Sequence, residues 1–298
     1  MTAAPHAEAS LALGLPPLRE VIRRHRLSAD KRFGQHFLLD LNLTARIARA
    51  AGALSAGTTI EVGPGPGGLT RALLEGGAGR LVAVEKDPRC IAALADLVHA
   101  AHGRLELIEA DAAAIDMAAL GAPPRRIVAN LPYNVGTHLL IGWLHAIDGF
   151  DSLTLMFQKE VAARLTAAPG GRDYGRLSVL AQYQAEVRAL FDIPARAFTP
   201  PPKVDSTLVR FVKRAAREPI PGLDRLETVT AAAFGQRRKM LRASLKPLGV
   251  DTGALLEQAG ITPTARAETV DVAGFAALAR AYAALTNRAA IKSGGSTG

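Results

Sequence analysis

A glycine-rich turn between a β-branched segment and a helical pattern constrains the fold of this chain most. Residues 58–62 read Thr-Thr-Ile-Glu-Val, which is typical of a buried strand, and residues 69–74 have the apolar spacing of a helix. The glycines of the intervening run, 63–68, allow positive φ angles and a close approach of the backbone to a ligand. Strand, glycine turn and helix in this order predict a parallel α/β sheet with a ligand at the strand end.

Further apolar runs predict the remaining strands, at 81–84, 104–108, 127–129, 152–157, 187–191 and 207–212. Strand and helix patterns alternate from about residue 60 to residue 193, as expected of a doubly wound sheet. Segment 207–212 alternates like a half-buried strand and is expected to close the sheet. The proline-rich segment 198–206 is excluded from a central position and is expected to lie across the mouth of the site.

Two acidic residues stand where predicted strands end. Glu85 follows residues 81–84, where an acid would hydrogen-bond the ribose hydroxyls of a nucleotide cofactor. Asp111 follows the third strand and would accept a hydrogen bond from the adenine amine of a cofactor without pyrophosphate. Either acid can instead cap the next helix. Because Gly63, Gly65 and Gly68 also satisfy the dinucleotide fingerprint, a nicotinamide or flavin enzyme is an open alternative.

The segment Asn130-Leu131-Pro132-Tyr133-Asn134 follows the apolar run 127–129. The Asn130 side-chain oxygen and a nearby carbonyl can accept hydrogen bonds from an exocyclic amine, and Pro132 restricts the backbone there. Tyr133 offers a flat face for a nucleobase. A plain strand-to-loop turn is the alternative for this segment alone. Together with the glycine turn and the two acids, it points to S-adenosylmethionine as methyl donor and an adenine amine as acceptor.

These motifs resemble those of the ribosomal RNA adenine dimethyltransferase family, specifically its bacterial small-subunit (16S) branch. The resemblance runs from about residue 31 to residue 271 and is carried by segments 31–38, 61–65, 130–134, 158–162, 174–179, 198–206 and 234–239. It implies an α/β, Rossmann-like class I S-adenosylmethionine-dependent methyltransferase domain with a small all-helical C-terminal domain. It also implies transfer of two methyl groups to each of two adjacent adenosines near the 3′ end of 16S rRNA.

The resemblance assigns roles to individual residues. It implies that the methyl donor is bound by His36, Leu38, Gly63, Gly65, Glu85, Asp111 and Asn130. The catalytic corner comprises Asn130, Leu131, Pro132 and Tyr133, and the target base would stack between Tyr133 and Phe198. The family often has Asn where this chain has His36, and a histidine would make that contact pH-sensitive.

The charge balance favours a nucleic-acid partner. The 298 residues carry a formal net charge of +9, and this length suggests about two domains. Residues 234–246 contain five basic side chains and no acid, with apolar residues at helix-compatible spacing. We expect a helix here with one buried face and one basic face that binds RNA through Arg237, Arg238, Lys239 and Arg242. A solvated helix face is the alternative.

The expected organisation has four parts: an N-terminal extension over 1–28, the methyltransferase domain over 29–214, a helical RNA-binding domain over 215–288 and a disordered tail over 289–298. The single Cys90 excludes an intramolecular disulfide and suits a reducing cytoplasm. No signal peptide, transmembrane segment or metal site is expected. The expected partner is 16S rRNA within the small subunit or its precursor, bound by a monomer.

Three competing functions use parts of the same pattern. Relatives that modify large-subunit rRNA and confer macrolide resistance share the glycine turn and the Asn-x-Pro-Tyr corner, but segments 198–206 and 234–239 favour the small-subunit branch. A ribosome-assembly factor that has lost catalysis would have no need of Glu85, Asp111 and Asn130. An NAD enzyme leaves the segment 130–134 unexplained.

Overall fold

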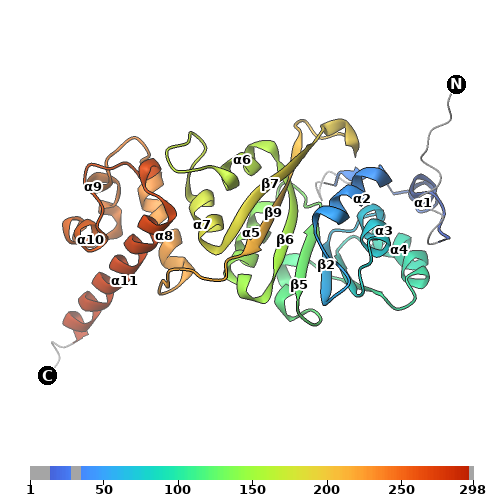
Figure 1. The fold of residues 1–298 in the computed structure, drawn as a ribbon, viewed down its shortest axis with the longest axis horizontal. Helices are drawn as coiled ribbons and strands as arrows, with labels where there is room; N and C mark the ends of the chain where they lie inside the picture. Colours follow the sequence, from blue (N-terminus) through green and yellow to red (C-terminus); the bar gives the residue numbers. More distant parts are fainter. Residues whose placement is uncertain (1–13, 28–34, 295–298) are drawn as a thin grey trace. The chain divides into compact units, whose positions relative to one another are not determined.

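The computed structural model describes residues 14–27 and 35–294. The chain forms two compact units, which are described separately (Figure 1). The first comprises Met1–Ala162 and Arg188–Lys213, and the second comprises Ala163–Val187 and Arg214–Gly298.

A seven-stranded sheet with the order β4-β3-β2-β5-β6-β9-β7 forms the centre of the first unit. Strands β2 to β6 pair in parallel, and β9 runs antiparallel to β6. All seven predicted strands are present: β2 (Thr58–Val62), β3 (Leu81–Glu85), β4 (Leu105–Glu109), β5 (Arg125–Ala129), β6 (Ser152–Gln158), β7 (Ala185–Ile193) and β9 (Ser206–Lys213).

The parallel register brings the ends of the central strands together. Glu61 of β2 pairs with Ala83 of β3 and with Val128 of β5, so both neighbouring strands end beside the glycine turn. Glu85 at the end of β3 pairs with Glu109 at the end of β4. Ligand sites in open α/β sheets lie at this carboxyl edge, where loops leave the strands.

Helices α2 (Leu41–Ala50), α3 (Gly68–Glu75) and α4 (Pro88–Ala100) pack against one face of this sheet. Their apolar residues form one buried cluster with residues from the strands, including Ile47, Leu73, Leu94, Leu81, Ala83, Val128, Met156 and Leu208. Asp40 caps α2, because its Oδ1 accepts hydrogen bonds from the backbone amides of Asn42 and Leu43. Two further helices follow strands, α5 (Gly136–His145) and α6 (Lys159–Thr166).

A small second sheet joins two segments that are far apart in the sequence. Strand β1 (Phe37–Leu38) pairs antiparallel with β8 (Phe198–Thr199), with Phe37 opposite Thr199 and Leu38 opposite Phe198. We call residues 35–38 the arm. The proline-rich segment is thus held against the arm and takes no place in the central sheet, in agreement with the prediction that it is not a central strand.

Part of the predicted N-terminal extension packs against the first unit. Helix α1 (Leu18–Arg24) buries Leu18 and Val21, and Val21 belongs to a small apolar cluster with Cys90 and Ala93 of α4. Arg24, within the basic run Arg23-Arg24-His25-Arg26, contacts the carboxylates of Glu20 and Asp96. Residues 1–13, and residues 31–34 of the first family motif, lie outside the described residues.

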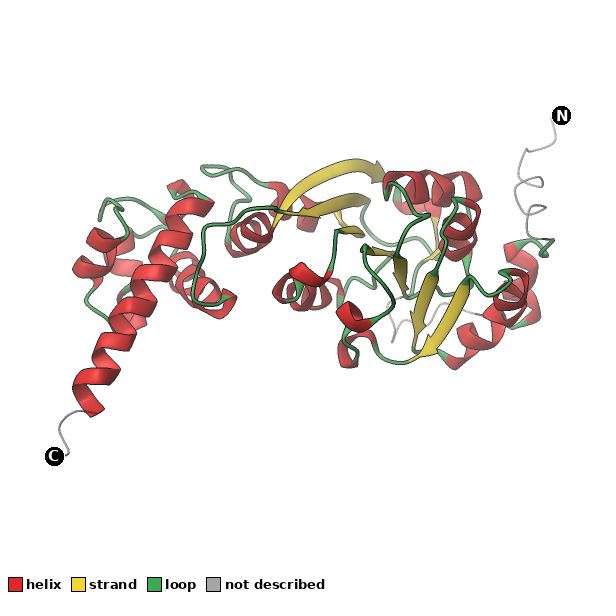
Figure 2. Cartoon of the chain, turned by 60° about the horizontal axis from the view of Figure 1, so that its bottom comes forward, coloured by secondary structure: helices red, strands yellow, loops and turns green. Residues whose placement is uncertain are grey.

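The second unit is built from α7 (Arg176–Gln184), α8 (Leu223–Gly235), α9 (Leu241–Ser244), α10 (Thr252–Gln258) and α11 (Val272–Gly294) (Figure 2). Its aromatic core contains Phe234, which stacks on Phe275 with ring centroids 5.3 Å apart and meets Tyr174 edge-on at 6.0 Å. Across both units, the described residues include short 3-10 turns at Ala112–Ala114, Met117–Ala119, Ile147–Gly149, Ala195–Ala197, Lys246–Leu248 and Ala267–Thr269.

The division into units differs from the predicted boundary in one respect. Residues 163–187 group with the helical unit, although the sequence pattern predicts a continuous domain from residue 29 to residue 214. The side-chain amide of Gln182 donates to the carbonyls of Leu165 and Ala167, and the Tyr183 hydroxyl donates to the carbonyl of Glu218. The two bonds of Gln182 hold residues 163–187 together, and the bond of Tyr183 fastens α7 to the residues that follow 214.

Helix α11 continues to Gly294, within the predicted tail over 289–298, and residues 295–298 lie outside the described residues. One prediction about the C-terminal part is wrong. Residues 234–246 are not one helix, because α8 ends at Gly235 and α9 begins at Leu241. The backbone amide of Leu241 bonds instead to the carbonyl of Ala265.

Within the described ranges, no helix is long and apolar enough to cross a membrane.

Candidate active site

A pocket opens at the carboxyl edge of the central strands. It is lined by the arm, the glycine turn, the ends of β3 and β4, and the segment after β5. Every residue predicted to bind the methyl donor or to form the catalytic corner lines it: His36, Leu38, Gly63, Gly65, Glu85, Asp111, Asn130, Leu131, Pro132 and Tyr133. Phe198, the second predicted stacking residue, does not line it, and its side chain is almost completely buried.

The glycine turn requires its glycines for two separate reasons. Gly63, Gly65 and Gly67 have φ values of +70°, +54° and +92°, which residues with a Cβ rarely adopt. A Cβ built on Gly68 would lie 2.4 Å from the carbonyl oxygen of Leu38, so the arm's backbone packs directly on the start of α3. At Gly63 the same construction meets no atom within 4 Å, so the space above this residue is open to a ligand.

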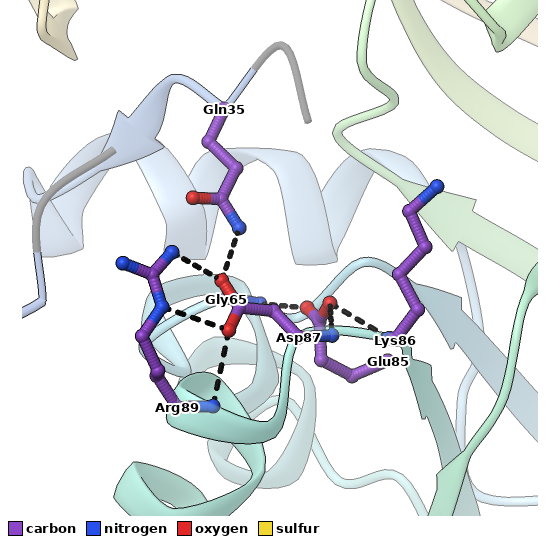
Figure 3. Close-up of polar contacts among 6 residues, drawn as sticks. All are labelled: Gln35, Gly65, Glu85, Lys86, Asp87 and Arg89. Carbon is purple, nitrogen blue, oxygen red and sulfur yellow. Dashed lines mark hydrogen bonds and ion pairs between the residues drawn. The ribbon is translucent and has the colours of Figure 1, made fainter. Parts of the chain in front are cut away.

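Glu85 is held by the backbone amides around it (Figure 3). Its Oε2 accepts a 3.0 Å hydrogen bond from Gly65 N, and its Oε1 accepts bonds from Lys86 N at 2.9 Å and Asp87 N at 3.0 Å. Burial raises the pKa of this carboxyl, and these amides act in the opposite direction. Because each carboxylate oxygen can accept two hydrogen bonds, Oε2 retains capacity for a ribose hydroxyl.

Asp111 caps the following turn, which is one of the two roles that the sequence left open, and it also lines the pocket. Its Oδ1 accepts a 2.9 Å bond from Ala113 N and caps the following 3-10 turn, and this bond lowers the carboxyl pKa. Its Oδ2 lies 3.6 Å from Lys86 Nζ, at the rim of the pocket. Capping therefore uses one oxygen and leaves the other facing a lysine that the sequence analysis did not consider.

The side-chain amide of Asn130 has a defined orientation. Its Nδ2 donates a 2.9 Å hydrogen bond to the backbone carbonyl of His36, so Oδ1 is the atom that remains to accept a bond from a ligand. Pro132 contributes through its carbonyl, which accepts from Gly136 N and starts α5. Leu131 is buried beneath this corner. The arm and the end of β5 thus form one continuous wall of the pocket.

The His36 ring has two aromatic neighbours. Its centroid lies 5.6 Å from that of Tyr133 and 6.5 Å from that of Phe198, the two predicted stacking residues. His36 Nδ1 lies 2.8 Å from the carbonyl of Pro200, and a carbonyl only accepts, so Nδ1 carries the proton. The Tyr133 hydroxyl bonds to Ser206 Oγ at 2.5 Å, which fixes the ring.

Glu61 lines the pocket and was not predicted to have a role. It is 1% exposed, and its Oε2 has no hydrogen-bond partner among the described residues. Burial, reinforced by the nearby charge of Glu85, raises the pKa of the Glu61 carboxyl to about 8. The Thr70 side chain acts in the opposite direction, and the open Oε2 of this buried acid favours a cationic or hydrogen-donating ligand beside it. Glu61 opens segment 61–65, which carries the family resemblance, but its position inside a predicted strand suggested a structural residue.

The four predicted RNA-binding residues belong to the second unit and differ in their surroundings. Arg237 Nε bonds to Glu268 Oε2 at 2.9 Å, and its Nη2 donates to the carbonyl of Gly171. Arg238, Lys239 and Arg242 are exposed. Segment 234–246 contains no acid, but in the folded unit Glu268 lies beside Arg237 and neutralises part of its charge.

The order of the strands, with five parallel strands and an antiparallel β9, and the pocket at the carboxyl edge define a class I methyltransferase fold. Residues 26–284 match the family model described as ribosomal RNA adenine dimethylase, and the chain belongs to this family. This membership also excludes the NAD-enzyme alternative.

The sequence relatives agree with this family. Ribosomal RNA small subunit methyltransferase A from Rhodospirillum rubrum is 62% identical over 268 residues, which cover 90% of this chain and 93% of the relative. The protein of the same name from Paramagnetospirillum magneticum is 61% identical over 274 residues, covering 91% and 96%.

Solved structures show the same fold. The 23S rRNA methyltransferase ErmE superposes with a TM-score of 0.63 and 27% identity, over 83% of this chain and 99% of ErmE. A dimethyladenosine transferase from Plasmodium falciparum has a TM-score of 0.68 and 24% identity, over 80% of this chain and 94% of that chain.

Proposed function

We propose that this enzyme transfers methyl groups from S-adenosylmethionine to the N6 amines of two adjacent adenosines near the 3′ end of 16S rRNA, as part of small-subunit maturation in the cytoplasm. The observation that carries the proposal is the orientation of Asn130. Its Nδ2 is engaged by the His36 carbonyl, and its Oδ1 is left as an acceptor beside Tyr133 in a pocket of this enzyme family.

The pocket fits the proposed methyl donor. Glu85 and Asp111 present carboxylate oxygens for ribose hydroxyls and for an adenine amine, and the space above Gly63 is open. Glu61 provides a buried carboxyl for the cationic end of the molecule. His36 and Leu38 of the arm would hold it from the other side. When bound, S-adenosylmethionine supplies an electrophilic methyl group on a sulfonium.

The residues on the acceptor side make an unreactive amine reactive. The lone pair of an adenine amine is delocalised into the ring, and Asn130 Oδ1 would counter this by accepting a hydrogen bond from an N6 proton. Tyr133, fixed by Ser206, would hold the base by stacking. Alignment of this kind contributes about 7 to 11 kcal/mol in well-oriented reactions. The nitrogen loses its proton after the methyl group arrives, so no strong general base is required.

Sequence identity to the relatives favours the small-subunit substrate over the large-subunit alternative. The relatives named for the small subunit are about twice as similar to this chain as ErmE is, at 62% and 27% identity. We propose that exposed Arg238, Lys239 and Arg242 contact the RNA backbone, and that the enzyme acts as a monomer on the subunit or its precursor.

The proposal is tested by methyl transfer from radiolabelled S-adenosylmethionine to unmethylated small subunits and, in parallel, to large-subunit RNA, with the modified nucleotides mapped. Dimethyladenosine at two adjacent positions near the 16S 3′ end is the expected result. Label only in large-subunit RNA would reassign the substrate. Binding to small subunits without any transfer would make the protein an assembly factor.

A further inference from the structure

A cluster of polar side chains beside the pocket joins the arm to the start of α4 (Figure 3). Gln35 opens the arm, Asp87 follows β3, and Arg89 lies in the first turn of α4. Gln35 Nε2 donates to Asp87 Oδ2 at 3.0 Å, although the two residues are 52 positions apart. None of these residues has a role in the methyl-transfer chemistry described above.

The carboxylate of Asp87 is buried, and both of its oxygens accept two hydrogen bonds. The side chain is 1% exposed. Its Oδ1 accepts from Arg89 N and Arg89 Nε, both at 3.0 Å, and its Oδ2 accepts from Arg89 Nη2 at 2.7 Å and from Gln35. These four bonds fill the acceptor capacity of a carboxylate. Capping of α4 requires only the bond from Arg89 N. The bond from Gln35 is not part of the cap and connects the arm to α4.

Asp87 is also hydrogen-bonded to residues that line the pocket. The backbone amide of Asp87 donates to Glu85 Oε1, and Glu85 Oε2 accepts from Gly65 N, so hydrogen bonds run from the arm to the glycine turn. The arm also packs directly on the glycine turn, since the Phe37 ring would lie 3.3 Å from a Cβ on Gly65.

We infer that Gln35 and Asp87 form a latch that holds the arm against the glycine turn, and that Gln35 is therefore a positioning residue for binding of the methyl donor. The inference rests on the proposed methyl donor for its functional part. All four residues of the arm line the pocket, Gln35 itself and the following His36, Phe37 and Leu38, so a displaced arm would alter the pocket wall. A held arm binds more tightly because its ordering cost is met before the ligand arrives.

Three substitutions at residue 35 separate the latch from a merely steric contact. Gln35→Leu removes the donated bond at similar size, Gln35→Lys restores a donor toward Asp87, and Gln35→Glu places a second carboxylate beside it. We expect the affinity for S-adenosylhomocysteine, measured by calorimetry, to fall about tenfold in the Leu variant and further in the Glu variant, with the Lys variant near wild type. Gln182→Leu is the matched control, because the Gln182 side-chain amide makes two half-buried hydrogen bonds in the other unit. It should lower thermal stability without changing this affinity.

A second readout does not depend on any ligand. Hydrogen exchange at the amides of Phe37 and Leu38 should become faster in ligand-free Gln35→Leu at an unchanged thermal midpoint. Equal affinities for the Leu, Lys and Glu variants, or unchanged exchange in the arm, would overturn the latch. Failure of the wild-type protein to bind S-adenosylhomocysteine would overturn the proposed methyl donor instead, and the exchange measurement would still test the latch.

Discussion

The side-chain amide of Asn130 donates a 2.9 Å hydrogen bond to the backbone carbonyl of His36. This bond connects the corner after β5 to the arm, which is 94 residues earlier in the sequence. It also decides which end of the Asn130 amide can meet a substrate. The acceptor geometry of the site is therefore a property of two segments together.

Substitution of Asn130 tests this geometry. Asn130→Ala removes the proposed acceptor, and Asn130→Asp keeps an acceptor but loses the bond to the His36 carbonyl. We expect both to lower kcat by about 100-fold or more, because the target amine is no longer aligned. Binding of S-adenosylhomocysteine should survive in part. Unaltered turnover in either variant would remove Asn130 from the mechanism.

Glu85 is expected to control affinity for the methyl donor. In Glu85→Gln, the side-chain NH2 would face one of the three backbone amides that now donate to the carboxylate. We expect the dissociation constant of S-adenosylhomocysteine to rise about tenfold or more in this variant and in Glu85→Ala. Calorimetry measures the change, with exposed Glu257→Gln in α10 as the control. Wild-type affinity would refute the ribose contact.

The ring of Tyr133 and its hydroxyl can be tested separately. Tyr133→Phe keeps the stacking face but loses the bond to Ser206 Oγ, whereas Tyr133→Ala loses both. Stacking of one base contributes about 1–3 kcal/mol, so kcat/KM for RNA should fall by roughly 10- to 100-fold in the Ala variant and less in the Phe variant. The same fall in both would show that the hydroxyl, rather than the ring, matters.

Glu61 is expected to make the stability of the ligand-free protein depend on pH. Its pKa is raised from 4.5 to about 8, so between these values the folded protein holds a proton that the unfolded chain has lost. The free energy of unfolding therefore falls as pH rises through this range, by at most about 1.4 kcal/mol per pH unit. Glu61→Gln should flatten the decline of the thermal midpoint, and Glu257→Gln should not. Parallel profiles for the wild type and Glu61→Gln would contradict this ionisation.

We expect the exposed basic residues of the second unit to bind RNA and Arg237 to stabilise the fold. Arg238→Ala and Lys239→Ala should each weaken binding to small subunits and reduce the salt slope by about one. Arg237→Ala should lower the stability of the unit by about 1 kcal/mol, because its partly exposed ion pair with Glu268 is lost. Glu268→Gln serves as the matched variant for that pair. An unchanged salt slope after loss of Arg238 and Lys239 would locate the RNA surface elsewhere.

The sequence by itself determined the strands, the glycine turn, the acids at the strand ends and the corner after β5. These features depend on local periodicity and on residue types that only certain backbone conformations accept, and the residues predicted to line the pocket do so, except Phe198.

The tertiary structure decided which distant groups become partners. It set the arm against the glycine turn, directed Asn130 to His36, bonded Gln35 to Asp87 and paired Arg237 with Glu268. It also joined residues 163–187 to the helical unit and ended α8 at Gly235. Such pairings depend on packing and burial of side chains that are far apart in the sequence, and no local pattern encodes which of the available partners will be nearest.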